Sequence, residues 1–274
     1  QMCIRDRLFI LTIISVDDGH VGFEVSGESE RTAVKYDKKN SRFSFEDHDN
    51  LSEILANNQV QLQKVIKSAL KGKPAPGRQI QCVFIKDFTF LNNHDYNHYI
   101  RIDRRGINPA ISVSTEETNG IYKLYADGSY AKESNRSGYA GIIVNKEGND
   151  EVYYGSFPGG SSCLMELMAV TEGLKQLGPV KKIRINTDSR FVIRGLAQWI
   201  HFWRLNNWQM AYGRKVRYAK HWQQLDKLSQ GKLLELKWIK AHSGDNKHKL
   251  CHHLAKQLAT RGIHEPITTA SGGV

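Results

Sequence analysis

The sequence has few cysteines and no apolar run long enough to cross a membrane. Its 274 residues include only four cysteines, which are scattered and form no CxxC pair: Cys3, Cys82, Cys163 and Cys251. This spacing argues against a disulfide framework and a zinc ribbon and fits a reducing compartment, so we expect a cytoplasmic protein. No stretch of about 18 apolar residues occurs, which argues against a transmembrane helix.

The N-terminal stretch resembles a weak export signal but lacks its cleavage site. QMCIRDRLFILTIISV has a basic start and an apolar run, but DDGH follows where small residues would mark a cleavage site. The apolar part, LFILTIISV, is instead typical of a buried strand. Because the chain does not begin with Met, we expect it to be a fragment.

The positive charge is concentrated in the second half of the chain. Residues 1–119 carry 16 Lys and Arg against 16 Asp and Glu. Residues 120–274 therefore carry the other 23 basic and 12 acidic residues, and the whole net charge of +11. A polyanion such as a nucleic acid is a natural partner for such a segment. Composition alone equally allows a basic, soluble surface without such a partner.

The first part of the chain combines short β-type segments with one helical segment. FILTIISV, VGFEV, TAVKYD and RFSFE are bounded by turn residues, and residues 50–72 have apolar side chains at helical spacing. We predict a small α+β domain over residues 1–103, without a catalytic motif, and a polar linker over residues 104–119. His94 and His98 have the i,i+4 spacing of a metal pair, but their Asn and Tyr neighbours favour a loop or strand.

From residue 120 the pattern changes to three strands followed by alternating helices and strands. The strands begin with IYKLYADGSY, and a helix, a strand, two helices, a strand and a last helix follow. This order predicts an α/β architecture with a mixed five-stranded sheet flanked by helices over residues 120–262. Residues 263–274 are predicted to be a tail.

Three carboxylates lie at positions where side-chain packing does not account for a charged group. Asp127 and Asp188 are each placed at the end of an apolar strand, and Glu166 lies within the apolar helical segment CLMELMAV. A buried carboxylate without a partner is unfavourable, so each needs a basic side chain or a cation. One interpretation is three separate salt bridges. The other is that the three converge and bind Mg²⁺ or Mn²⁺, which favour oxygen ligands; two such ions can hold a phosphodiester for in-line attack by water.

Four motifs resemble those of the ribonuclease HI family in order and spacing: YADGSY, MELMAVTEGL, NTDSRFVIRGLAQWIHFWRLNNW and WIKAHSG. The resemblance spans residues 121–261 and implies an RNase H-like fold. It also implies a metal-dependent enzyme that cuts the RNA strand of RNA/DNA hybrids and leaves 3′-hydroxyl and 5′-phosphate ends. Asp127, Glu166 and Asp188 match three of the family's four acidic ligands. His242 matches its mobile histidine, with an implied role in proton transfer or product release.

The fourth acid of the family is missing from this sequence. Counting from AHSG places His252, in CHHLA, where the family has an aspartate that opens the last helix. A neutral imidazole removes a negative charge and offers nitrogen. The resemblance therefore implies that His252 is a metal ligand, with a preference for Mn²⁺ over Mg²⁺. The adjacent His253 is predicted to lie on the surface.

Substrate contacts are also implied by the resemblance. Ser161 and Ser162 stand where many relatives have asparagines that read the 2′-hydroxyl of RNA, and Ser129 lies in the first motif; a hydroxyl can still donate and accept. Residues 199–220 contain no acidic residue and resemble the family's basic protrusion, which grips the DNA strand. The alternative is an amphipathic helix and a solvated loop, with tryptophans partly in the core. The implied contacts in this stretch are Trp199, Trp203, Trp208, Arg214, Lys215 and Arg217.

The leading interpretation is a metal-dependent endoribonuclease, preceded by a domain of unassigned role that could contact a protein partner. The competing interpretation is a non-catalytic hybrid-binding module in which loss of the fourth acid has abolished hydrolysis. The three retained acids and His242 argue against it. A reverse-transcriptase fragment would need polymerase motifs upstream, and none is visible in the sequence. We expect a monomer that does not associate with membranes.

Overall fold

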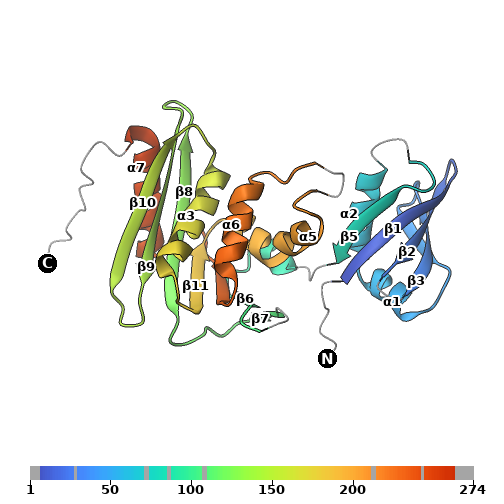
Figure 1. Ribbon diagram of the computed structural model, residues 1–274, viewed down its shortest axis with the longest axis horizontal. Coiled ribbons are helices and arrows are strands. Elements are labelled where there is room, and N and C mark those ends of the chain that lie inside the picture. The colour runs from blue at the N-terminus through green and yellow to red at the C-terminus, as the bar shows by residue number, and fades with distance from the viewer. Residues whose placement is uncertain are drawn as a thin grey trace. The chain divides into compact units, whose positions relative to one another are not determined.

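The computed structural model of the chain divides into two compact units, residues 1–87 with 201–217 and residues 88–200 with 218–274 (Figure 1). None of the helices in the described part of the chain is both long and apolar enough to cross a bilayer. The described residues are 7–27, 30–70, 74–84, 88–106, 110–210, 214–241 and 244–262.

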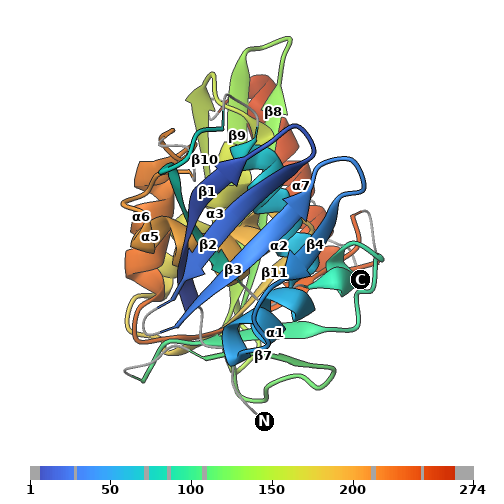
Figure 2. The ribbon, with the colours of Figure 1, turned by 90° about the vertical axis from the view of Figure 1, so that its right-hand side faces the viewer.

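An antiparallel sheet and two helices form the N-terminal part of the first unit (Figure 2). Along β1, Phe9, Leu11 and Ile13 alternate with more exposed residues and are at most 1% exposed themselves. The apolar start of the chain is therefore a buried strand, which lies between β2 and β5, and the α+β prediction is confirmed. The sheet has the order β4-β3-β2-β1-β5. Its elements are β1 (Arg7–Val16), β2 (His20–Ser26), β3 (Arg31–Asp37), β4 (Arg42–Phe45), α1 (Asn50–Asn57), α2 (Gln59–Ala69) and β5 (Gln79–Phe84).

One helix was predicted over residues 50–72, of which residues 71–72 lie outside the described residues; the described part of this segment, residues 50–70, forms two helices. Asn58 interrupts it: its backbone N–H donates to the Leu55 carbonyl, and its side-chain amide donates to the Ile54 carbonyl at 2.8 Å. Asn is prone to such local hydrogen bonds, which compete with a continuing helix. Both helices still bury apolar side chains in one core with β1, β2 and β3.

The second unit is built on a mixed sheet whose order is β10-β9-β8-β11-β12-β6-β7. Strands β8, β11 and β12 are parallel to one another, and the remaining pairings are antiparallel. The mixed α/β sheet flanked by helices is therefore confirmed. Its strands are β6 (Tyr99–Asp103), β7 (Ala110–Ser114), β8 (Tyr122–Ala131), β9 (Arg136–Val144), β10 (Asp150–Pro158), β11 (Lys182–Thr187) and β12 (Leu233–Trp238). The other elements are η1 (Thr89–Leu91), α3 (Ser162–Leu177), α4 (Arg190–Arg194), the π-helical η2 (Gly195–Trp199), α5 (Ile200–Leu205), α6 (Ala219–Ser229) and α7 (Asn246–Arg261).

This sheet extends upstream of the predicted boundary, with seven strands in place of five. β6 falls in the segment assigned to the first domain and β7 in the predicted linker, residues 104–119. β6 pairs with β12, and Arg104, directly after β6, is 6% exposed and binds the Asp226 carboxylate at 2.7 Å. The stretch predicted as a linker is polar and rich in turn residues; in the structure Arg104 pairs inside the unit and residues 110–114 form β7. The predicted tail lies outside the described residues.

Helices α3 and α7 approach the sheet closely at two glycines. A Cβ atom on Gly128 of β8 would lie 2.2 Å from the Glu166 backbone nitrogen of α3. A Cβ atom on Gly138 of β9 would lie 2.6 Å from the Ala255 carbonyl of α7. Because Gly138 pairs with Ser129, and neighbouring strand residues point to opposite faces, the two helices cover opposite faces of the sheet. Figure 1 shows them on its two sides.

Candidate active site

The register of two parallel strands brings Asp127 and Asp188 together. β11 pairs with β8 from Ile183↔Tyr122 to Asn186↔Tyr125, and continuing this register places Asp188 level with Asp127. Asp188 follows the last residue of β11, as predicted. Asp127, however, lies inside β8, because β8 continues to Ala131 through its pairing with β9. Asp127 borders the site because the neighbouring parallel strand β11 ends beside it at Thr187, although β8 itself continues.

Asp188 is held where the chain leaves the sheet. The Trp238 indole Nε1 donates to the Asp188 backbone carbonyl at 3.0 Å. The next residue, Ser189, caps α4 by accepting from the Val192 N–H at 3.3 Å. This short connection fixes the direction in which the Asp188 carboxylate points.

Glu166 reaches the same region from α3. The Ser189 hydroxyl donates to Glu166 Oε2 at 2.5 Å, so the residue after Asp188 also fixes Glu166. Burial raises the pKa of the Glu166 carboxyl to about 7, and the negative charges of Asp188 and Asp127 add to this effect. A carboxylate in such a position gains from a nearby cation.

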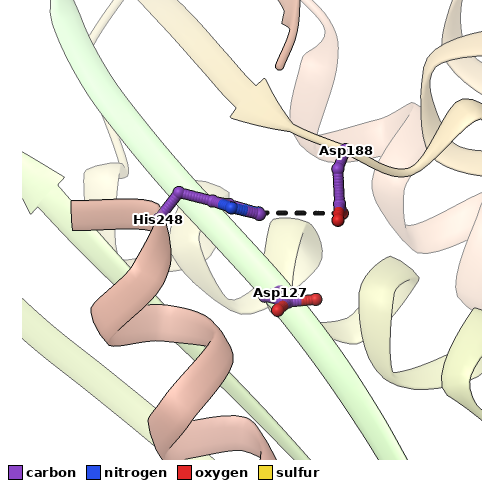
Figure 3. A group of neighbouring side chains, drawn as sticks. All are labelled: Asp127, Asp188 and His248. Atoms are coloured by element: carbon purple, nitrogen blue, oxygen red, sulfur yellow. Dashed lines mark ion pairs between the residues drawn. The ribbon is translucent and has the colours of Figure 1, made fainter. Parts of the chain in front are cut away.

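Two histidines from the first turns of α7 face the two aspartates. His252 Nδ1 lies 2.8 Å from Asp127 Oδ2. His248 Nε2 lies 3.6 Å from Asp188 Oδ1, and Figure 3 shows its ring directed at that carboxylate with Asp127 close by. His253 is exposed, as predicted. Because residues four apart share a helix face, α7 presents His248 and His252 together.

The electrostatics of the site follow from burial and mutual proximity. Burial raises the pKa of Asp127, and the charge of Asp188 adds to this, while the two histidines oppose it. Burial also acts to raise the pKa of Asp188, but the ion pair with His248 outweighs it and the net shift is downward. The pKa of His248 is raised: burial opposes the change, and Asp188 outweighs burial. Burial is therefore the largest single influence on all three groups, and Asp188 and His248 stabilise each other in their charged forms.

The donor set suits a divalent metal ion. Asp127, Asp188 and His248 each offer a ligand atom, and these atoms all lie within 4.8 Å of one another. His248 Nε2 is buried and, among the described residues, contacts only the Asp188 carboxylate at 3.6 Å, beyond hydrogen-bond distance, so in its neutral form it could serve as a ligand. The alternative of three separate salt bridges to Lys or Arg is not what the described residues show. The two aspartates pair with histidines, and Glu166 accepts a hydrogen bond from a serine.

Sequence reasoning missed His248. It identified His252 from its place in a motif and assigned no role to the residue one turn earlier. The i,i+4 spacing of two histidines at the start of a helix, next to a position expected to bind metal, was the available signal. The other i,i+4 pair, His94 and His98, forms no such cluster: His98 lies 3.1 Å from the Asp95 carboxylate and stacks on Phe90.

The predicted substrate-contact serines have different surroundings. Ser161 is the N-cap of α3, and its hydroxyl accepts from the Leu164 N–H at 3.2 Å and lies 2.7 Å from the Tyr218 hydroxyl. Ser162 is exposed, and Ser129 is half-buried. The Ser161 hydroxyl is thus already used within the protein, whereas Ser162 is open to solvent.

The basic stretch has exposed cations and partly buried rings. Trp203 is 7% exposed, so for this residue the structure favours the core alternative. Trp199 and Trp208 are half-buried. The cations of the stretch, Arg214, Lys215 and Arg217, are exposed. His242, the predicted mobile histidine, lies outside the described residues.

Comparison with known proteins identifies a family that the chain matches. The RNase H family model matches residues 119–260. A ribonuclease H of Idiomarina loihiensis is 33% identical over 54% of this chain and 92% of its own length. A ribonuclease H of Tolumonas auensis is 35% identical over 50% of this chain and 88% of its own. The crystal structure of LC9-RNase H1 is 22% identical, with a TM-score of 0.46, over 53% of this chain and 74% of that one.

Proposed function

The chain belongs to the RNase H family, and we propose that it is a metal-dependent endonuclease that hydrolyses the RNA strand of RNA/DNA hybrids. The observation that carries the proposal is the convergence of Asp127 and Asp188 with His248, beside Glu166, where strand β11 ends. Such a cluster, in a chain whose net positive charge of +11 lies in residues 120–274, fits the cleavage of a polyanion.

Asp127, Glu166 and Asp188 would hold the divalent ions, and an imidazole of the pair His248 and His252 would complete the ligand set. Two such ions, when bound, would supply an activated water and stabilisation of charge on the phosphate, and we propose products with 3′-hydroxyl and 5′-phosphate ends. Because imidazole nitrogen suits Mn²⁺ better than Mg²⁺, we propose that Mn²⁺ supports the higher activity.

The chain's own groups orient this site. His252 lies against Asp127 at 2.8 Å and limits the rotation of that carboxylate. Ser189 does the same for Glu166 at 2.5 Å. We propose that His242 moves a proton or assists product release, in keeping with its place in the family motif.

Substrate binding is proposed for the exposed parts of the predicted contacts. Arg214, Lys215 and Arg217 would contact phosphates of the DNA strand, and the exposed Ser162 would contact the RNA 2′-hydroxyl. Trp203 is left out of this surface because its ring is buried. A role in binding a protein partner remains our proposal for the N-terminal domain.

The test is cleavage of a labelled RNA/DNA hybrid by the wild type and by Asp188→Asn, with Mg²⁺ and Mn²⁺ in parallel. Asp188→Asn removes a charge needed for metal binding with little steric change. It should abolish cleavage while hybrid binding and the unfolding transition stay close to wild type. Near-wild-type rates for Asp188→Asn in both metals would show that the site is elsewhere. A wild type that binds the hybrid but cleaves it with neither metal would favour the non-catalytic binding module.

A further inference from the structure

Residues 88–98, here called the upstream segment, precede the part of the chain that matches the RNase H family model, residues 119–260. They nevertheless belong to the same compact unit as the active site. Phe88 and Leu91 are fully buried, and the segment leads directly into β6, which pairs with β12. The upstream segment is thus part of the catalytic unit of this chain.

Three contacts attach the upstream segment beside the active site. Arg194 of α4 donates to Asn92 Oδ1 at 2.7 Å. Lys237 of β12 donates from its ammonium group to the Tyr96 backbone carbonyl. The Tyr96 ring lies against the Trp238 indole, with ring centroids 4.3 Å apart at 35°. One contact is made by α4, which begins two residues after Asp188, and two are made by the end of β12, where Trp238 bonds to the Asp188 carbonyl.

Trp238 connects this segment to a proposed metal ligand. Its indole Nε1 donates to the Asp188 backbone carbonyl at 3.0 Å, and the side chain is 5% exposed. The last β11–β12 ladder contact nearby is the bond from the Ile239 N–H to the Thr187 carbonyl at 3.1 Å. Asp188 therefore lies just beyond the last hydrogen bond between the two strands. There its backbone is restrained by the hydrogen bond from the Trp238 indole.

We propose that Tyr96 is a positioning residue for Asp188. Its ring fixes the Trp238 indole, and the indole in turn fixes the main chain from which the Asp188 carboxylate projects. Groups that orient a metal ligand influence metal affinity even though they do not touch the ion. This inference rests on the proposed function, in that it takes Asp188 to be a metal ligand.

The experiment measures Mn²⁺ binding to the full chain by the electron paramagnetic resonance signal of free Mn²⁺. The variants are Tyr96→Ala, Tyr96→Phe, Trp238→Phe and the double variant Tyr96→Ala/Trp238→Phe. Tyr154→Ala is the matched control, since Tyr154 is 44% exposed on β10 at the far edge of the sheet. Circular dichroism establishes that each variant is folded at the assay temperature.

Tyr96→Ala should weaken Mn²⁺ binding by about 10-fold, at the low end of the range for groups that orient metal ligands. Tyr96→Phe keeps the ring and should bind like the wild type, as should Tyr154→Ala. Trp238→Phe loses the indole N–H and should show a similar loss. Because both residues act through one hydrogen bond, the double variant should lose no more than either single variant. The KM for the hybrid should stay within about twofold of wild type in Tyr96→Ala, since substrate contacts are untouched.

Several results would overturn the inference. These are unchanged Mn²⁺ affinity in Tyr96→Ala, additive losses in the double variant, an equal loss in Tyr154→Ala, or a wild type that binds no Mn²⁺. Failure of the proposed function is distinct: a wild type that binds Mn²⁺ but does not cleave the hybrid would refute hydrolysis, and the binding series would still decide the role of Tyr96.

Discussion

Replacing Gly128 by alanine should impair catalysis because α3 crosses β8 without room for a side chain. A Cβ atom at this position would lie 2.2 Å from the Glu166 backbone nitrogen and 2.4 Å from the Met165 carbonyl carbon. Both atoms belong to the helix backbone, so no side-chain rotation can relieve the overlap. The helix that carries Glu166 must move away from the strand that carries Asp127.

The size of the effect follows from the overlap. Ordinary contact begins at about 3.4 Å, so the helix must shift by about 1.2 Å at this point. Overpacking of this kind lowers the free energy of unfolding by about 1–3 kcal/mol. A displacement of about 1 Å in a catalytic group can lower the rate roughly 100-fold. Gly128→Ala should therefore remain folded and lose about 100-fold in kcat.

The assay combines hybrid cleavage at saturating metal with unfolding in urea. Gly19→Ala is the control, because a Cβ atom there would meet no atom closer than Asp17 Oδ1 at 4.0 Å. It should leave both measurements unchanged. A Gly128→Ala protein with wild-type kcat and wild-type stability would refute the close approach of α3 and β8.

Other predictions concern charge and metal. Replacing Arg214, Lys215 and Arg217 by Ala should raise KM and reduce the slope of log K against log salt by about 0.7–0.9 for each lost phosphate contact; an unchanged slope would assign these residues to an inert surface. His252→Asp should shift the activity from Mn²⁺ toward Mg²⁺, and identical metal profiles for wild type, His252→Asp and His252→Ala would exclude a ligand role. Burial raises the pKa of the Glu166 carboxyl from 4.5 to about 7, so the metal-free folded chain retains a proton that the unfolded chain releases, and stability falls as pH rises through this window. Glu166→Gln should reduce this slope in urea unfolding with EDTA, leaving the part due to Asp127 and His248, and stabilise the chain at pH 8 by up to about 3 kcal/mol; a slope equal to wild type would contradict the assigned burial.

The sequence alone was sufficient for the elements whose signal is local. Alternating apolar residues predicted the buried strand at the start of the chain, and the order of strands and helices predicted the mixed sheet of the second unit. The resemblance to a family identified the chemistry expected of Asp127, Glu166 and Asp188. Each of these conclusions depends on residue type and spacing along the chain, which the sequence records directly.

The tertiary structure decided which distant residues meet. The sequence did not predict that β6 and β7 join this sheet, because residues 104–119 are polar and turn-rich and because the pairing of Arg104 with Asp226 joins residues far apart in the chain. Tyr96 gained a connection to Asp188 only through the packing of Trp238.

The two histidines of α7 also show what the sequence alone could not predict about the site. Sequence spacing places His248 and His252 on one helix face, but it does not say what that face covers. The close approach of α7 at Gly138 brings both rings to the aspartates, His252 to Asp127 and His248 to Asp188. Local patterns report the conformation of a segment, whereas a ligand set depends on distances between segments, and those are fixed only when the sheet register and the helix packing are formed together.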